Sequence, residues 1–246
     1  MDKYVIDGGR RLYGTVALQS AKNSVLPLLA ASILTEKRVT IREAPNISDV
    51  ACMAQILREL GATVRFSGGN VTIDSADACC HEIPSSLTKE LRSSVFMLGS
   101  LLSRFGRALI AYPGGCDIGL RPIDLHLSAL KRLGVTISER DGFIFCECSR
   151  LKGAEILLDF PSVGATENIM IAAALADGVT VIENAAAEPE IIDLADFLNG
   201  MGADIKGAGG DAIYIEGKPK LHGCVHRIIP DRIEAGTFLI SGAILK

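Results

Sequence analysis

One pattern recurs three times along the chain, at a spacing of about seventy residues. Each copy has an apolar stretch, a short β-branched segment, an amphipathic segment ending at a glycine, and a turn between two alternating segments. The three glycines are Gly61, Gly134 and Gly202. Glycine ends a helix well because it adopts the left-handed conformation without a Cβ penalty. The pattern therefore predicts three similar βα units, each closed by a hairpin.

The boundaries of the predicted elements follow from this periodicity. Apolar helices are expected over residues 25–34, 95–102 and 169–176, and the strands after them over 39–41, 108–111 and 179–182. Amphipathic helices are expected over 49–60, 122–133 and 189–201. Asp-Gly and Gly-Gly pairs supply the positive φ of tight turns, which places hairpins at 68–70, 141–142 and 209–211.

The apolar pattern also predicts which layer lies inside. The apolar stretches are hydrophobic on every face, as in helices surrounded by protein. The strands around residues 38–42 and 213–216 alternate apolar and polar residues, as in sheets with one wet face. We therefore expect an α/β (α+β type) fold, an inside-out α/β barrel of three repeated units with buried helices and outer mixed sheets. This is the reverse of a TIM barrel or a Rossmann fold, and no G-x-G-x-x-G follows a strand.

The repeat series is interrupted near the end of the sequence. Residues 231–246 begin another all-apolar helix, and no strand or hairpin follows it. Such a helix exposes an apolar surface that favours association. We expect either that the chain is a fragment of a longer protein, or that Thr237 to Leu245 packs on this domain or on a second copy in self-association.

Composition excludes several classes of protein. Apolar residues make up 48% and charged residues 22%, as in a globular domain, and the net charge of -4 argues against broad nucleic-acid binding. The longest apolar runs, such as residues 25–34, are shorter than the ~20 residues of a membrane helix. Residues 1–14 lack the layout of a signal peptide. We therefore expect a cytoplasmic protein without membrane or nucleic-acid partners.

Cysteines are the next candidates for chemistry. Seven cysteines, an odd number, indicate reduced thiols rather than a disulfide framework. Cys79-Cys80-His81 and Cys146-x-Cys148 do not have zinc-site spacing, so no metal site is expected. Cys116 differs, because glycines and Arg121 surround it in the segment 113–122 between a strand and a helix. A cation can stabilise the thiolate of an exposed thiol. The alternative is a buried spare cysteine.

Three cations lie near the starts of the predicted helices or in the loop: Lys22, Arg92 and Arg121. A cation at a helix N-terminus opposes the helix dipole unless an anion binds there too. The third apolar helix instead starts with residues 162–166, Ser-Val-Gly-Ala-Thr, whose hydroxyls and backbone N–H groups suit a phosphate. The pattern therefore favours an anionic ligand, with solvated surface cations as the alternative.

Five segments, in order along the whole chain, resemble the UDP-N-acetylglucosamine 1-carboxyvinyltransferases, a family of enolpyruvyl transferases that begin peptidoglycan synthesis. They are S-A-K-N at 20–23, L-R-S-S at 91–94, P-G-G-C-D-I-G-L-R-P-I-D-L-H at 113–126, S-V-G-A-T-E-N at 162–168 and P-D-R-I-E-A-G-T at 230–237. The cysteine segment separates this family from the related 3-phosphoshikimate enolpyruvyl transferases. Ser20 departs from the family's usual glycine.

The resemblance implies specific roles. Lys22 is expected to contact phosphoenolpyruvate beside Asn23, Arg92 to bind the nucleotide sugar, and Arg121 to contact the phosphate of phosphoenolpyruvate. Cys116 is expected to protonate the enol methylene, to form a covalent phospholactoyl adduct and to react with fosfomycin. The uridine diphosphate side is expected to be lined by Pro122, Ile123, Asp124, Leu125, Ser162, Val163 and Gly164. The expected ligands are phosphoenolpyruvate and UDP-N-acetylglucosamine, with no cofactor.

The resemblance also implies two similar lobes of three units each, with the active site between them. Residues 22–229 are expected to form one complete lobe, and residues 1–21 and 230–246 to begin the other. The aspartate that deprotonates the sugar hydroxyl has no counterpart here, so we expect negligible turnover from this chain alone. Two alternatives stay open: a noncatalytic nucleotide-sugar-binding or regulatory module, and a structural repeat domain whose cysteine is incidental.

Overall fold

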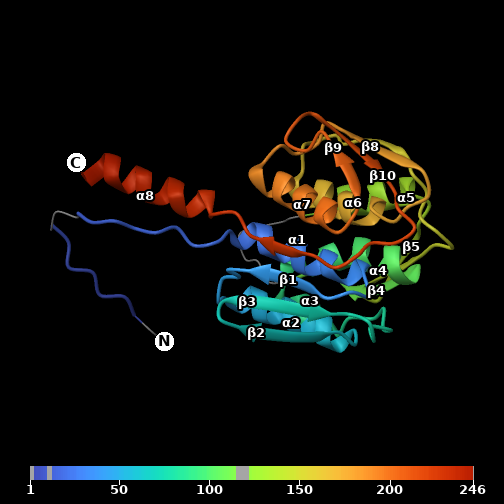
Figure 1. Ribbon diagram of the computed structural model, residues 1–246, viewed down its shortest axis with the longest axis horizontal. Coiled ribbons are helices and arrows are strands. Elements are labelled where there is room, and N and C mark those ends of the chain that lie inside the picture. The colour runs from blue at the N-terminus through green and yellow to red at the C-terminus, as the bar shows by residue number, and fades with distance from the viewer. Residues whose placement is uncertain (1–2, 10–12, 115–121, 246) are drawn as a thin grey trace.

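The three repeated units of the sequence are three repeated units of structure (Figure 1). The computed structural model describes residues 3–9, 13–114 and 122–245. The first unit consists of helix α1 (Lys22–Ala31) with a 3-10 turn η1 (Ser32–Leu34), strand β1 (Val39–Arg42), helix α2 (Ser48–Glu59) and the hairpin β2 (Thr63–Ser67) and β3 (Asn70–Asp74). The predicted helices, strand and hairpin turn of this unit are confirmed.

The second and third units repeat this order. The second has η2 (Arg92–Phe96), α4 (Met97–Phe105), β4 (Arg107–Ala111), α5 (Asp124–Arg132), β5 (Thr136–Arg140) and β6 (Phe143–Glu147). The third has α6 (Val163–Ala173), β8 (Val179–Glu183), α7 (Pro189–Gly200), β9 (Asp204–Lys206) and β10 (Ala212–Glu216). Helix α6 begins six residues earlier than predicted, because the Ser162 hydroxyl accepts the Ala165 N–H and caps it. Helix α4 ends at Gly106, whose φ is 70°.

Short strands that the sequence pattern missed join the units to one another. Strand β11 (Val225–Arg227), after the third unit, pairs in parallel with β1 of the first, in a sheet of order β11-β1-β3-β2. Strand β7 (Glu155–Leu157), after the second unit, pairs in parallel with β8, in a sheet of order β7-β8-β10-β9. In the sheet β4-β6-β5, a parallel bridge pairs Glu82, which follows the first unit, with Leu109 of β4 in the second unit. Each unit is thus linked to the next, and the third to the first.

The central helices are buried, as predicted. Figure 1 shows α1, α4 and α6 between the sheet of β1–β3 and the sheet of β8–β10. Every residue from Ser24 to Ala31 in α1 and from Ala165 to Ala173 in α6 is buried. Helices α4 and α6 approach closely at Gly99, where an added Cβ would lie 2.5 Å from the Asn168 side-chain oxygen. The observed architecture is the expected inside-out α/β arrangement, and it brings the starts of the central helices to one end.

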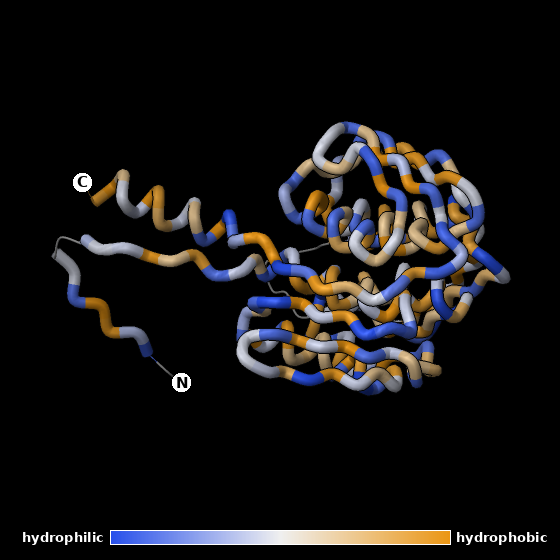
Figure 2. Tube along the Cα trace, in the orientation of Figure 1, coloured by the Kyte–Doolittle hydropathy of each residue, from blue (hydrophilic) through white to orange (hydrophobic). Residues whose placement is uncertain are grey.

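Two segments extend away from this body (Figures 1 and 2). They are the described N-terminal residues 3–9 and 13–19, taken as one, and helix α8 (Arg232–Leu245), which has no buried residue. Helix α8 forms nevertheless because the Asp231 carboxylate accepts the N–H groups of Ile233 and Glu234. Leu239 is 75% exposed, so of the alternatives expected for Thr237 to Leu245, packing on this domain is wrong, and the other two stay predictions. No helix among the described residues is long and apolar enough to cross a bilayer.

Candidate functional site

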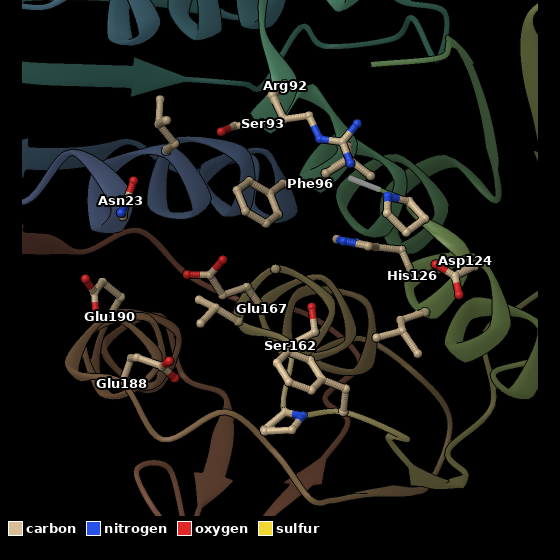
Figure 3. A pocket seen from close by; sticks show the side chains of 18 of the residues that line it. Asn23, Arg92, Ser93, Phe96, Asp124, His126, Ser162, Glu167, Glu188 and Glu190 are labelled. Atoms are coloured by element: carbon tan, nitrogen blue, oxygen red, sulfur yellow. The ribbon is translucent and has the colours of Figure 1, made fainter. Parts of the chain in front are cut away.

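A cavity of about 910 Å³ opens where the starts of several helices meet (Figure 3). Its walls come from α1, η2, α5, α6, α7 and the first residue of α8. The lining residues are Asn23, Leu26, Arg92, Ser93, Val95, Phe96, Pro122, Asp124, Leu125, His126, Asp159, Phe160, Pro161, Ser162, Val163, Gly164, Glu167, Glu188, Glu190 and Arg232. Repetition of one unit creates this convergence, because equivalent helix starts lie at the same end of the fold.

Most of the residues proposed from the sequence lie around this cavity. Those that line it are Asn23, Arg92, Pro122, Asp124, Leu125, Ser162, Val163 and Gly164. Lys22 is not among them, since its ammonium forms an ion pair with Asp49 of α2, Nζ to Oδ2 at 2.6 Å. Ile123 is 5% exposed and belongs to the hydrophobic core at the start of α5. Cys116 and Arg121 lie outside the described residues, so their roles stay predictions.

The start of helix α6 gives the cavity backbone donors. Ser162 is the N-cap, and its hydroxyl oxygen accepts the Ala165 N–H at 3.3 Å. The first N–H groups of a helix have no partner within the helix, and those of Val163 and Gly164 occupy this position. The partial positive charge of a helix N-terminus favours an anion. This wall can therefore accept phosphate oxygens.

Arg92 provides the cationic side chain of the same cavity. It begins η2, and its Nη1 donates to the Pro113 carbonyl at 3.4 Å. Figure 3 shows its guanidinium and the Ser162 side chain on opposite sides of the His126 ring. A guanidinium presents a planar set of donors that matches phosphate geometry. Arg92 and the α6 N-terminus thus form an electropositive end of the cavity.

His126 and Asn168 lie in two of the segments that resemble the family, but the sequence alone predicts no role for them. Nδ1 of His126 lies 3.1 Å from Nδ2 of Asn168, and His126 is 8% exposed. The pKa of His126 is lowered to about 4, mainly by burial. The positive charge of Arg92 also lowers this pKa, and the negative charge of Asp124 raises it by a smaller amount. The imidazole is therefore neutral at physiological pH. An asparagine within an otherwise apolar helix was the sequence signal that could have identified this pair.

An acidic wall on α6 and α7 was also missed. Glu167 is 1% exposed, and its Oε1 has no hydrogen-bond partner in the part of the chain that the structure describes. Burial, followed by Glu190 and Glu188, raises the pKa of Glu167 well above its usual range. Glu190 differs because both of its carboxylate oxygens lie 3.0 Å from Nε of Arg232. The cavity thus has an electropositive end and an end with a buried carboxyl group whose pKa is raised.

Metal coordination finds no support in this arrangement. Within residues 3–9, 13–114 and 122–245, no cluster of three or more His, Cys, Asp or Glu side chains is placed to hold a metal ion. Cys79 and Cys80 are exposed, whereas Cys146 is buried, with a pKa raised to about 12 by burial. The described side chains that line the cavity offer hydrogen-bond donors and charged groups.

Comparison with known proteins identifies the family. Residues 6–246 match the family described as EPSP synthase (3-phosphoshikimate 1-carboxyvinyltransferase). The chain belongs to this family. Among solved structures, the chain is similar to the enolpyruvyl transferase NikO from Streptomyces tendae, with a TM-score of 0.85 and 28% identity over 96% of this chain and 56% of that one. EPSP synthase from Acinetobacter baumannii shares the fold, with a TM-score of 0.72 and 20% identity over 94% of this chain and 54% of that one.

Curated relatives named UDP-N-acetylglucosamine 1-carboxyvinyltransferase are more similar in sequence. The chain is 55% identical over 246 residues to UDP-N-acetylglucosamine 1-carboxyvinyltransferase 2 of Caldanaerobacter subterraneus, and covers 59% of it. It is 49% identical over 245 residues to the protein of the same name from Bacillus subtilis, and covers 57% of it. The chain therefore spans less than two thirds of the length of these relatives.

Proposed function

We propose that this chain carries the nucleotide-sugar site of an enzyme that transfers the enolpyruvyl group of phosphoenolpyruvate to the 3-hydroxyl of UDP-N-acetylglucosamine. The observation that carries this proposal is the convergence of Arg92 and the N-terminus of α6 on one cavity. A diphosphate needs such a combination of charge and backbone donors. Relatives at 48% to 55% identity, named UDP-N-acetylglucosamine 1-carboxyvinyltransferase, support the choice of ligand.

The proposed reaction is an addition followed by an elimination. The sugar 3-oxygen bonds to the central carbon of phosphoenolpyruvate as Cys116 protonates the methylene carbon. In this proposal Lys22 contacts phosphoenolpyruvate and Arg121 contacts its phosphate. Loss of phosphate and of one methyl proton then restores the double bond. The family resemblance supplies these three roles. It assigns removal of the hydroxyl proton to an aspartate outside residues 1–246, so we propose negligible turnover by these residues alone.

The position of helix α8 supports a proposed division into two lobes. Residues 22–229 form one lobe in this proposal, and residues 1–21 and 230–246 belong to a second. The exposed apolar side chains Phe238, Leu239 and Ile240 of α8 need a cover, which a second lobe or self-association through this helix would supply. The same proposal includes a role in peptidoglycan synthesis, and through it in cell shape and division. It also includes a cytoplasmic location and the labelling of Cys116 by fosfomycin.

A noncatalytic nucleotide-sugar-binding module is the second candidate. The cavity is walled by residues 23–232 although the chain spans 57% to 59% of its curated relatives. Binding therefore does not require the remaining length of those relatives in this proposal. Both candidates bind the same nucleotide sugar, but only the enzyme transfers the enolpyruvyl group to it.

Calorimetric titration of residues 1–246 with UDP-N-acetylglucosamine, and separately with 3-phosphoshikimate, tests the choice of ligand. We expect one equivalent of the nucleotide sugar to bind and the shikimate ester not to bind. Arg92→Met should weaken binding at least tenfold, since a charge-assisted hydrogen bond contributes about 1.5–3 kcal/mol. Arg65→Met is the matched control, because Arg65 is exposed on β2. Binding of 3-phosphoshikimate in preference to the nucleotide sugar would contradict the proposal.

A phosphate-release assay tests the remaining part. With phosphoenolpyruvate and UDP-N-acetylglucosamine present, residues 1–246 should release no phosphate above background. Steady release would contradict the expected lack of turnover and would favour the enzyme over the noncatalytic module in these residues alone.

A further inference from the structure

Two adjacent cysteines lie in the connection between the first and second units. Cys79 and Cys80 follow β3 and precede helix α3 (Ser85–Glu90), and both are exposed. Their backbone N–H groups donate to the same acceptor, the carbonyl of Leu60, at 3.1 and 3.3 Å. In an extended strand, successive residues point in opposite directions. The shared acceptor shows that the backbone turns at this pair, so the two side chains are not directed to opposite faces.

The backbone after the pair is held as well. The His81 carbonyl accepts the N–H of Leu109 in β4, and the Ile83 N–H donates to the Leu109 carbonyl, each at 3.0 Å. Gly61 packs against the same connection, since a Cβ added there would lie 2.9 Å from the carbonyl oxygen of Asp77. The two thiols therefore project from a backbone whose position is fixed by hydrogen bonds and packing.

The two thiols interact with each other. The pKa of Cys80 is raised, mainly by a side-chain hydrogen bond with Cys79, and the negative charge of Glu82 raises it further. A hydrogen bond that favours the protonated form of Cys80 makes this thiol the donor and Cys79 the acceptor. A sulfur that accepts a hydrogen bond carries negative charge more easily, and the thiolate is the nucleophile. Of the two, Cys79 is therefore the one suited to attack.

The other described cysteines are less suited to reaction. Burial is the main cause that raises the pKa of Cys52 and Cys224 to about 11 and that of Cys146 to about 12. Burial also raises the pKa of Cys148. A raised pKa leaves little thiolate at neutral pH, and a buried sulfur is hard to reach. Exposure and the hydrogen bond from its neighbour thus distinguish Cys79 from these four thiols.

Cys79 and Cys80 are poorly placed to form a disulfide with each other. A trans peptide bond joins them, so their Cα atoms are about 3.8 Å apart. Disulfides usually join Cα atoms that are roughly 4.4–6.8 Å apart, and departures from this geometry store strain. A group attached to Cys79 through a mixed disulfide is therefore not readily expelled by Cys80.

Charge near the pair favours one kind of small disulfide. Asp77 and Glu82 are exposed on either side of the two cysteines. Because opposite charges attract, a disulfide with ammonium groups is favoured here over one with carboxylates. Cystamine carries an ammonium group at each end, whereas glutathione disulfide has a net negative charge.

We propose that Cys79 is a modification site for small cationic disulfides of the cystamine class, with Cys80 as the positioning thiol that donates to it. The Cys79 thiolate attacks one sulfur of the disulfide, and a new S–S bond forms as the original one breaks. The other half leaves as a thiolate and takes up the proton lost by Cys79. Cys79 is oxidised and the departing half is reduced. Neither cysteine is among the residues that line the large cavity, so this inference does not rest on the proposed function.

Reaction with cystamine, followed by peptide mass spectrometry, tests the site. Trypsin releases residues 66–89 as one peptide, in which Cys79 and Cys80 are the two cysteines. We expect a single cysteamine adduct on Cys79 at neutral pH, and slower modification by glutathione disulfide at equal concentration. An adduct on Cys80 instead, a disulfide within the peptide, or faster modification of Cys148 would overturn the proposal. Faster modification by glutathione disulfide would overturn the preference for a cationic reagent.

Two variants of residue 80 test the positioning role. Cys80→Ala removes the donor and should slow modification of Cys79 about two- to tenfold. Cys80→Ser keeps a hydroxyl donor and should restore most of the rate. Cys224→Ser, at a cysteine outside this connection, is the matched control and should change the rate by less than about twofold. An unchanged rate in Cys80→Ala, or equal slowing in Cys80→Ala and Cys80→Ser, would overturn the role of Cys80 as donor.

Discussion

Asp193 of helix α7 lies 2.8 Å from His226 of strand β11, measured from Oδ1 to Nε2. The other oxygen of the same carboxylate accepts the hydroxyl of Ser24 in α1. Asp193 is 3% exposed and Ser24 is fully buried. Because β11 follows the third unit and pairs with β1 of the first, this carboxylate reinforces the contact between the first and third units.

Removal of this carboxylate should weaken the whole fold. We expect Asp193→Ala to lower the free energy of unfolding by about 2–4 kcal/mol, since the buried Ser24 hydroxyl and the His226 ring both lose their partner. Urea denaturation followed by circular dichroism measures this loss. Asp196→Ala, at an exposed position of the same helix, should cost less than about 1 kcal/mol. Equal effects of the two variants would contradict the structural role of Asp193.

Glu167 should destabilise the protein as pH rises. Its folded-state pKa is raised by burial, so its contribution to stability is fully present below the unfolded pKa of about 4.3 and is lost at higher pH. Glu167→Gln removes the ionisation and should increase the free energy of unfolding at neutral pH by about 1–3 kcal/mol. The gain should shrink toward pH 4. Urea denaturation at several pH values measures this gain in the free energy of unfolding. Glu183→Gln, at an exposed position, is the control. A gain independent of pH would refute this explanation.

His126 should have the opposite effect in acid. Its folded pKa of about 4 lies below the unfolded value of about 6.5, so stability falls as pH decreases through this range, by roughly 3 kcal/mol in total. His126→Gln keeps a polar side chain without this titration. The difference in unfolding free energy between the two proteins should therefore change between pH 6.5 and pH 4. A constant difference across this range would show that His126 is not held neutral.

Gly99 should tolerate no side chain. An alanine Cβ would lie 2.5 Å from Oδ1 and 2.6 Å from the backbone oxygen of Asn168, so α4 and α6 would have to separate. We expect Gly99→Ala to lower the melting temperature, with a loss of about 1–3 kcal/mol from overpacking. Gly242→Ala in α8 meets nothing within 4 Å and is the matched helical control. A melting temperature for Gly99→Ala at or above that of the parent protein would contradict the close helix approach.

Local pattern predicts the repeated units, and tertiary contacts determine the strands that join them. The hairpin turn at Asp141-Gly142 requires positive φ, at 53° and 77°, so the sequence could predict it. Strands β7 and β11 have three residues each, and their partners lie in another unit. A three-residue strand carries too little alternation to be recognised, and its pairing depends on how the units assemble.

The same distinction applies to the candidate site. Ser162 could be anticipated because a serine before an apolar helix has a local capping role. Asn168 and Glu167 interrupt an apolar helix. The partner of Asn168, Gly99, and the charged neighbour of Glu167, Glu190, belong to other helices. The roles of buried polar groups are set by partners that only the folded chain brings together. Lys22 is another case in which the partner decides the outcome. Its ion pair with Asp49 joins two helices and has no local sequence signal.

Amide ¹H–¹⁵N spectra recorded during titration with UDP-N-acetylglucosamine test the central proposal most directly. The account predicts saturable shifts concentrated around the large cavity, at Asn23, Arg92, Asp124, Val163 and Gly164. The β2–β3 turn at Gly68 and Gly69, which lines a separate cavity, should not respond. Shifts concentrated at that turn, or no shifts at saturating nucleotide sugar, would contradict the account.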